Sequence, residues 1–197
     1  DQIPQSFVLD DNGNQSLAEL GFIVINVASR GSSPLRGHDF YCFGYGNLRD
    51  YPLADCKFAI EQLADRYAYI DRDRVGIYGH SGGGMMAAAA ILTYPDFFKV
   101  AVAASGNYDN NIYTKWWGEM YHGVKMKVKK DADGIKKYIF ESKIPTIMEL
   151  AANLKGKLLL VTGDMDINVH PANTFRLANA LIKADKLFDM MVIPGAD

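Results

Sequence analysis

The sequence predicts an α/β protein whose doubly wound, mostly parallel sheet carries helices on both faces. Short runs rich in β-branched residues alternate with segments of helical apolar spacing along the 197 residues. The runs are continuously apolar, which is typical of strands buried on both sides. With 49% hydrophobic and 22% charged residues, the composition is that of a globular protein with one core. We therefore expect a single domain over residues 1–197.

Five strands and three helices account for most of this alternation. Pro95 closes the second helical segment, and Pro171 suits the first turn of the third. The expected strands are Gly21–Val27, Val75–Tyr78, Val100–Ala104, Lys157–Thr162 and Phe188–Ile193. The expected helices are Leu53–Tyr67, Gly82–Thr93 and Pro171–Ala184.

Residues 106–155 interrupt the alternation between the third and fourth strands. Insertions at the carboxyl ends of parallel strands shape the ligand crevice, so this insertion is the expected specificity wall. A short helix is expected to begin near Ile144. The basic run Lys125–Lys130 alternates with Met and Val and is followed by Asp131 and Asp133, which favours a solvated loop or helix start over a phosphate-binding stripe.

Charge and composition argue against several classes of function. A net charge of −2 gives no reason to expect a nucleic-acid partner. The longest apolar runs are far shorter than the roughly 20 residues that cross a bilayer, and residues 1–4 lack the features of a signal peptide. Cys42 and Cys56 form neither a metal-ligand cluster nor a disulfide framework, although one bridge between them stays open. We expect no metal and no cofactor.

The segment Gly79-His80-Ser81-Gly82-Gly83 matches the pattern G-x-S-x-G between a predicted strand and a predicted helix. In that context the serine occupies a strained turn that lifts its hydroxyl above the sheet. Gly79 and Gly83 are expected to remove steric clashes at the turn, and the backbone N–H of Gly82 is placed to stabilise an oxyanion. A plain Gly-rich turn is the alternative. Ser81 is the candidate nucleophile.

A serine nucleophile requires a histidine base and a carboxylate, in the chain order Ser, acid, His for this kind of fold. Asp164 and Asp166 both follow the fourth strand and qualify as the acid, with a turn aspartate as the alternative for either. His80 is expected to pack or hydrogen-bond beneath the turn, and His170 to cap a helix or line the crevice. The remaining histidines, His38 and His122, precede the acid. No histidine follows the fifth strand.

Several segments together resemble the catalytic domain of the prolyl oligopeptidase family, most closely its dipeptidyl peptidase IV-like branch, which has the α/β-hydrolase fold. The segment of highest specificity is GDMDINVHP at residues 163–171. The others are AELGFIV at 18–24, SRGS at 29–32, YGNLRD at 45–50, DRVGIYGHSGG at 73–83 and NIYT at 111–114.

The resemblance implies roles for particular residues. It selects Asp166 over Asp164 as the triad aspartate, places Asn168 and Val169 beside the substrate, and makes Tyr113 a pocket tyrosine. The family's catalytic histidine would come directly after Asp197. The family's oxyanion-hole tyrosine and its N-terminal β-propeller would also lie outside the 197 residues.

The function that follows from the resemblance is a serine peptidase that cleaves short peptides, of the dipeptidyl or prolyl type, through an acyl-enzyme on Ser81. A carboxylesterase is the second hypothesis, because the same serine chemistry serves esters. The third is an inactive fragment, because no histidine base is present in the expected place. The resemblance also implies a peptide substrate, a homodimer of the full-length protein, and a periplasmic or extracellular location.

Overall fold

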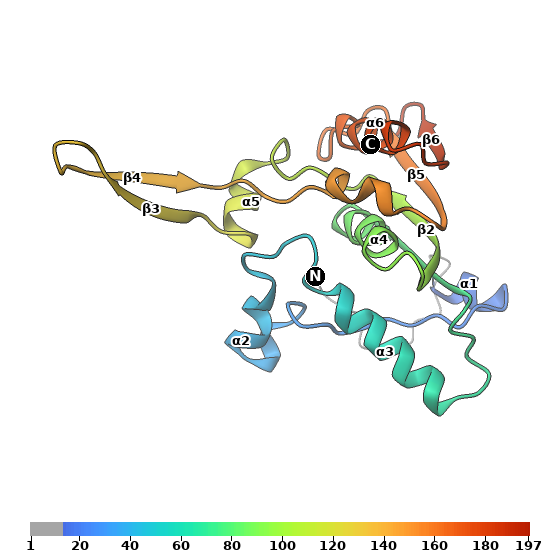
Figure 1. Ribbon diagram of the computed structural model, residues 1–197. Helices are drawn as coiled ribbons and strands as arrows, with labels where there is room; N and C mark the ends of the chain where they lie inside the picture. Colours follow the sequence, from blue (N-terminus) through green and yellow to red (C-terminus); the bar gives the residue numbers. More distant parts are fainter. Residues whose placement is uncertain (1–13) are drawn as a thin grey trace. The chain divides into compact units, whose positions relative to one another are not determined.

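The computed structural model describes residues 14–197, which form two compact units (Figure 1). The described part of unit 1 comprises residues 14–43 and 51–72, and unit 2 comprises residues 44–50 and 73–197. Each unit is described by itself below. The expectation of a single domain over residues 1–197 stays a prediction.

Unit 1 consists of short helices and one long one. The long helix α3 spans Leu53–Arg66 and confirms the predicted helix at this place. Asp55 in its first turn accepts hydrogen bonds from the backbone N–H of Arg30 at 2.9 Å and from the Arg30 guanidinium at 2.6 Å. These hydrogen bonds lower the pKa of the Asp55 carboxyl and tie the preceding segment to the helix. The short elements are α1 (Asn14–Glu19), η1 (Pro34–Arg36), α2 (His38–Tyr41) and η2 (Cys42–Gly44), the last of which ends in unit 2.

The predicted strand Gly21–Val27 is wrong, because the chain has no regular structure from residue 22 to residue 29. Phe22 and Ile23 are 62% and 52% exposed, whereas a strand inside a sheet would bury them. An apolar run indicates that a segment can be buried, but it does not indicate that the segment forms a strand. A strand also needs a neighbouring strand, and no strand among residues 14–197 pairs with this segment. Cys42 and Cys56 are free thiols, so they form no bridge.

Unit 2 is built on a four-stranded parallel sheet in the order β1-β2-β5-β6. The strands are β1 (Val75–His80), β2 (Phe98–Ala104), β5 (Lys157–Gly163) and β6 (Asp189–Ile193), each at a predicted place. Ala103 pairs with Leu160 across β2 and β5, and both side chains are fully buried. The mostly parallel α/β architecture predicted from the sequence is therefore confirmed.

Three helical elements pack on this sheet and on one another. The first is α4 (Gly82–Thr93), which lies against β1 and β2 and buries the run of small side chains from Ala87 to Ala90 completely. The others are η3 (Ile147–Asn153), which contacts both α4 and α6, and α6 (Ala172–Lys183). The contacts of η3 with both α4 and α6 place the three elements beside one another.

The insertion between β2 and β5 differs from its expected form. It contains α5 (Lys115–Tyr121) and an antiparallel hairpin of β3 (Lys125–Lys130) and β4 (Lys136–Glu141), which extends away from the parallel sheet of unit 2 (Figure 1). The expectation of a loop or helix start at Lys125–Lys130 is therefore wrong. Lysine alternates with Met and Val along this run with a period of two, which suits a strand with one apolar face. The helix expected near Ile144 is the 3-10 element η3.

Within residues 14–197, no helix is both long enough and apolar enough to cross a membrane.

Candidate active site

The turn between β1 and α4 holds Ser81 in a strained backbone conformation, with φ 56° and ψ −121°. A positive φ is uncommon for a residue other than glycine and persists only where the surroundings enforce it. The Ser81 N–H donates to the carbonyl of Ala104 at 2.9 Å, and the Ser81 carbonyl accepts from the N–H of Met85 at 3.0 Å. Strand β2 and helix α4 thus hold the turn from both sides, as the G-x-S-x-G pattern requires.

Two glycines make this turn sterically possible. A Cβ added at Gly79 would lie 2.4 Å from backbone atoms of Gly83, and one added at Gly84 would lie 2.2 Å from the carbonyl oxygen of Ala104. A Cβ at Gly83 would meet nothing within 4 Å. The expectation that Gly83 relieves a clash is therefore wrong. Gly84 has that role, because the helix begins directly against the end of β2.

Ser81 opens into a cavity of about 270 Å³ at the carboxyl end of the parallel sheet. The structure brings Ser81 together there with three residues named from the sequence, Asp166, Asn168 and Val169. The cavity is lined by His80, Ser81, Ser105, Asp166, Ile167, Asn168, Val169 and Asp197. Gly82 is the first residue of α4 and directly follows the serine. The role of its N–H as an oxyanion donor stays a proposal.

The two candidate aspartates have different surroundings. Asp166 is buried, and its Oδ1 accepts hydrogen bonds from the N–H groups of Asn168 at 2.9 Å and Val169 at 2.8 Å. Both bonds use one oxygen, which leaves Oδ2 for a further donor. Asp164 does not line the cavity, and its Oδ1 accepts from the N–H of Gly195 at 2.6 Å. Asp166 therefore closes a local turn inside the cavity, whereas Asp164 ties the segment after β5 to the segment after β6.

The chain beyond β6 returns to the same cavity. The N–H of Met165 donates to the carbonyl of Ala196 at 2.9 Å, and a Cβ added at Gly163 would lie 2.2 Å from that same oxygen. This close approach lays the segment after Ile193 alongside the segment that leads to Asp166. Asp197 consequently lines the cavity with Ser81.

The histidines lie in unlike environments. His80 is exposed and lines the cavity, so the expectation that it packs beneath the turn is wrong. His170 lies before Pro171, the N-cap of α6; its Nδ1 accepts from the N–H of Ala172 at 3.1 Å, and it does not line the cavity. His122 is buried, and its Nδ1 accepts from the N–H of Leu48 at 3.3 Å.

The wall beside Asp166 is aromatic and polar. The Tyr113 hydroxyl donates to Oδ1 of Asn168 at 2.9 Å, and the Tyr113 ring packs edge-on against Trp117 of α5, with ring centroids 5.6 Å apart. Tyr113 does not line the cavity itself but holds the amide of Asn168, which does. Val169 is 2% exposed and lines the cavity floor. The structure thus brings the three candidate substrate residues into one cluster.

A buried carboxylate anchors the start of the insertion. Asp109 is 2% exposed, pairs with the guanidinium of Arg176 in α6 at 2.9 Å, and accepts hydrogen bonds from the backbone and side chain of Asn111. Its own N–H donates to Oδ1 of Asn173, also in α6, at 3.0 Å. These contacts hold the loop that leads to Tyr113 against α6.

Sequence reasoning missed Ser105 as a cavity residue. Ser105 is buried at the end of β2 and has a positive φ of 44°, next to the Ser81 turn. Its place directly after a predicted strand was an available signal, because ligands bind outside the carboxyl ends of parallel strands. Among residues 14–197, no group of three or more His, Cys, Asp or Glu side chains is arranged to hold a metal ion.

A parallel sheet with a strained serine at a strand-to-helix turn and a carboxylate at the end of a later strand defines the α/β-hydrolase class. A model of the prolyl oligopeptidase family matches residues 9–197, and the chain therefore belongs to that family.

Named relatives agree with this membership. Dipeptidyl peptidase 8 of Homo sapiens is 32% identical over 180 residues, which cover 91% of this chain and 19% of the relative. Prolyl endopeptidase FAP of Mus musculus is 27% identical over 172 residues, covering 87% of this chain and 21% of the relative. The structure of Porphyromonas gingivalis dipeptidyl peptidase 4 matches with a TM-score of 0.71 and 27% identity, over 85% of this chain and 22% of that one. The chain spans about a fifth of the length of these relatives.

Proposed function

We propose that this chain is the hydrolase part of a serine peptidase that cleaves short peptides, of the dipeptidyl or prolyl type, through an acyl-enzyme on Ser81. The observation that carries the proposal is the shared cavity, in which the strained turn of Ser81 faces the buried and oriented carboxylate of Asp166. The relatives that are named as peptidases support a peptide substrate over other acyl compounds.

The proposed chemistry assigns each group one task. A histidine supplied from the position after Asp197 accepts the proton of the Ser81 hydroxyl as Oγ attacks the substrate carbonyl carbon. Oδ2 of Asp166 accepts a hydrogen bond from that imidazole, and the N–H of Gly82 donates to the oxyanion. The imidazolium then protonates the leaving amine as the C–N bond breaks, and water hydrolyses the acyl ester. The position of Asp197 in the cavity supports this source of the base.

Asn168 and Val169 are the proposed substrate contacts. The Tyr113 hydroxyl donates a hydrogen bond to Oδ1 of Asn168. The two N–H donors of the same amide remain for other acceptors, and a substrate carbonyl is a suitable acceptor. Val169 lines the cavity but is 2% exposed, so its proposed contact with substrate involves a small part of its surface. We also propose that the full-length protein is a homodimer.

Labelling by a fluorophosphonate tests the triad. Rates are compared between the 197-residue chain and the same chain extended by one C-terminal histidine, with Ser81→Ala and Asp166→Asn made in the extended chain. We expect the extension to raise the rate by about 10³-fold or more, since loss of a triad member costs several orders of magnitude. Ser81→Ala should abolish labelling, and Asp166→Asn should slow it. Equal rates with and without the added histidine would contradict the proposed base.

Substrate class is tested with the same extended chain. Turnover of a Gly-Pro anilide is compared with turnover of a short-chain nitrophenyl ester, because both acylate the same serine. Hydrolysis of the ester without any turnover of the anilide would exclude the peptidase and support the esterase. Slow labelling of the unextended chain would show only that residues 1–197 lack a base.

A further inference from the structure

Ser105 presents an unpaired hydroxyl to the cavity of Ser81. The residue is 6% exposed and lines that cavity, and among residues 14–197 its hydroxyl has no hydrogen-bond partner. The side-chain atoms that are fully buried without a partner in this part of the chain belong to Ser32, Thr93 and Asn107. The Ser105 oxygen is not one of them and is therefore open to the cavity. Because buried polar groups are nearly always hydrogen-bonded, this hydroxyl points to a ligand with a polar group.

The backbone on both sides of this hydroxyl is fixed. The N–H of Ser105 donates to the carbonyl of Val161 at 2.8 Å, and its positive φ of 44° persists only because the surroundings enforce it. Tyr108 is 1% exposed, and its hydroxyl donates to the carbonyl of Ala103 at 2.9 Å. A Cβ added at Gly106 would lie 2.4 Å from the Tyr108 ring. Ser105 is therefore held in place before any ligand binds, and a preorganised group loses little freedom on binding.

Ser105 follows the strand next to the one that carries the nucleophile. In the parallel pairing of β1 with β2, His80 is opposite Ala104, so Ser81 and Ser105 are the residues that directly follow the two strands. The N–H of Ser81 donates to the carbonyl of Ala104, which continues the pairing into the turn. Residues at the same level of neighbouring strands lie about 5 Å apart. The part of a bound substrate nearest to Ser105 is therefore the residue whose carbonyl carbon Ser81 attacks.

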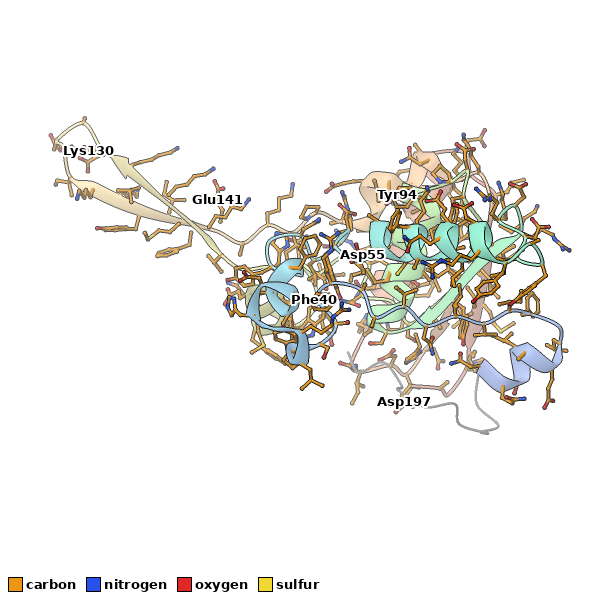
Figure 2. The ribbon with its side chains drawn as sticks, turned by 90° about the horizontal axis from the view of Figure 1, so that it is seen from below. Phe40, Asp55, Tyr94, Lys130, Glu141 and Asp197 are labelled. Carbon is orange, nitrogen blue, oxygen red and sulfur yellow. The ribbon has the colours of Figure 1, made fainter. Side chains whose placement is uncertain are left out.

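The cavity beside Ser105 is lined mostly by polar side chains. Its apolar residues are Val169, which is 2% exposed and offers little surface, and Ile167, which is 94% exposed and lies mainly in solvent. Asp197, labelled in Figure 2, adds a carboxylate to the lining. An apolar substrate side chain would therefore gain little contact here. A small side chain with a hydroxyl can instead hydrogen-bond to Ser105, because a serine hydroxyl both donates and accepts.

We propose that Ser105 is a specificity-determining residue that selects a small hydroxyl-bearing side chain, such as that of serine, directly before the scissile bond of the substrate. The hydroxyl of Ser105 and the hydroxyl of the substrate form one hydrogen bond, which an apolar side chain of the same size does not form. This inference deepens the proposed function and rests on it, because it takes a peptide that acylates Ser81 as the substrate.

The test compares kcat/KM for a Gly-Ser anilide and a Gly-Ala anilide, which differ by one hydroxyl, on the chain extended by one C-terminal histidine. We expect the wild-type sequence to favour the Gly-Ser anilide by about tenfold, the contribution of one hydrogen bond. Ser105→Ala should abolish this preference by slowing turnover of the Gly-Ser anilide about tenfold, while turnover of the Gly-Ala anilide stays within about twofold. Ser142→Ala is the matched control, because it removes a hydroxyl of the same unit that does not line the cavity, and it should keep the preference.

Urea unfolding first establishes that Ser105→Ala is folded, with an unchanged midpoint expected because the hydroxyl has no partner among the described residues. If the variant is not folded, Ser105→Gly replaces it, since glycine also removes the hydroxyl and adopts a positive φ without strain.

Several outcomes would overturn the inference and leave the peptidase standing. These are equal turnover of the two anilides by the wild-type sequence, turnover of the Gly-Pro anilide alone, and a Gly-Ser preference that persists without the Ser105 hydroxyl. An equal loss for both anilides in Ser105→Ala would assign the hydroxyl to the catalytic step rather than to the substrate side chain, and would overturn it as well. An extended chain that turns over none of the three anilides would contradict the peptidase and this inference together.

Discussion

Gly79→Ala tests the steric account of the Ser81 turn, and Gly83→Ala is its matched control. The new methyl at residue 79 would sit 2.4 Å from the carbonyl carbon and oxygen of Gly83, about 1 Å inside ordinary contact. Those atoms are backbone at the start of α4 and cannot swing aside. Overpacking of this kind costs about 1–3 kcal/mol, so we expect Gly79→Ala to lower the free energy of unfolding by about 2–3 kcal/mol. The same methyl at residue 83 meets open space.

Gly83→Ala should therefore be neutral or should stabilise the chain by up to about 1 kcal/mol, because alanine has the higher helix propensity. The assay is urea unfolding of the 197-residue chain followed by circular dichroism, with fluorophosphonate labelling of the histidine-extended chain as a second readout. A shift of about 1 Å at the serine turn should slow labelling by about 100-fold in Gly79→Ala alone. Equal losses of stability in the two variants would refute the reasoning.

Three further predictions concern the residues around the site. Asp109→Ala should lower the free energy of unfolding by about 2 kcal/mol in urea, because the buried carboxylate, its hydrogen bonds with Asn111 and its ion pair with Arg176 are lost; an equal loss in Asp96→Ala, which removes an exposed carboxylate, would contradict this. Burial, with a contribution from Lys125, lowers the pKa of His122 below its ordinary 6.5. The folded chain therefore favours the neutral imidazole, so the contribution of His122 to stability is present above pH 6.5 and is lost as the pH falls. The unfolding midpoint should therefore drop between about pH 7 and pH 5, and His122→Asn should remove part of that drop; an unchanged drop in the variant would contradict the assignment. Tyr113→Phe frees Oδ1 of Asn168 and should raise the KM of the histidine-extended chain for a Gly-Pro anilide by up to about tenfold, with an unchanged unfolding midpoint; an unchanged KM would contradict the positioning role.

Local signals predicted four of the five expected strands and the strained turn that holds Ser81. Each of those strands is a short apolar run between turn residues, and the parallel sheet follows from their alternation with helices. The strand expected at Gly21–Val27 and the loop expected at Lys125–Lys130 failed for one physical reason. Strand formation depends on a partner strand, which β3 has in the neighbouring β4 and the segment Gly21–Val27 does not have among the described residues, and neither segment by itself indicates its partner.

The residues of the candidate site also differ in whether a local sequence pattern could identify them. Ser81 was predictable because a glycine-flanked serine between a strand and a helix is a local pattern. Position alone could not separate Asp164 from Asp166, and the family resemblance favoured Asp166. In the structure Asp166 lines the cavity with Ser81 and Asp164 does not, and the role of Asp166 as the triad aspartate stays a proposal. His80 and Ser105 were not recognised as cavity residues, because side-chain direction at a strand end depends on packing between neighbouring strands.

The sequence by itself determined the fold class, the family resemblance and the candidate nucleophile Ser81, because these depend on residue types at short spacing along the chain. Only the tertiary structure decided which glycines the turn needs, which aspartate lies in the cavity with Ser81, that the chain after β6 returns to that cavity, and that the lysine-rich segment is a hairpin with an exposed apolar face. The hairpin depends on the pairing of two neighbouring strands, and the need for Gly79 on the tightness of the turn itself. The others depend on the approach of segments that are far apart in sequence. Contacts of that kind arise only when the whole sheet and its helices have assembled.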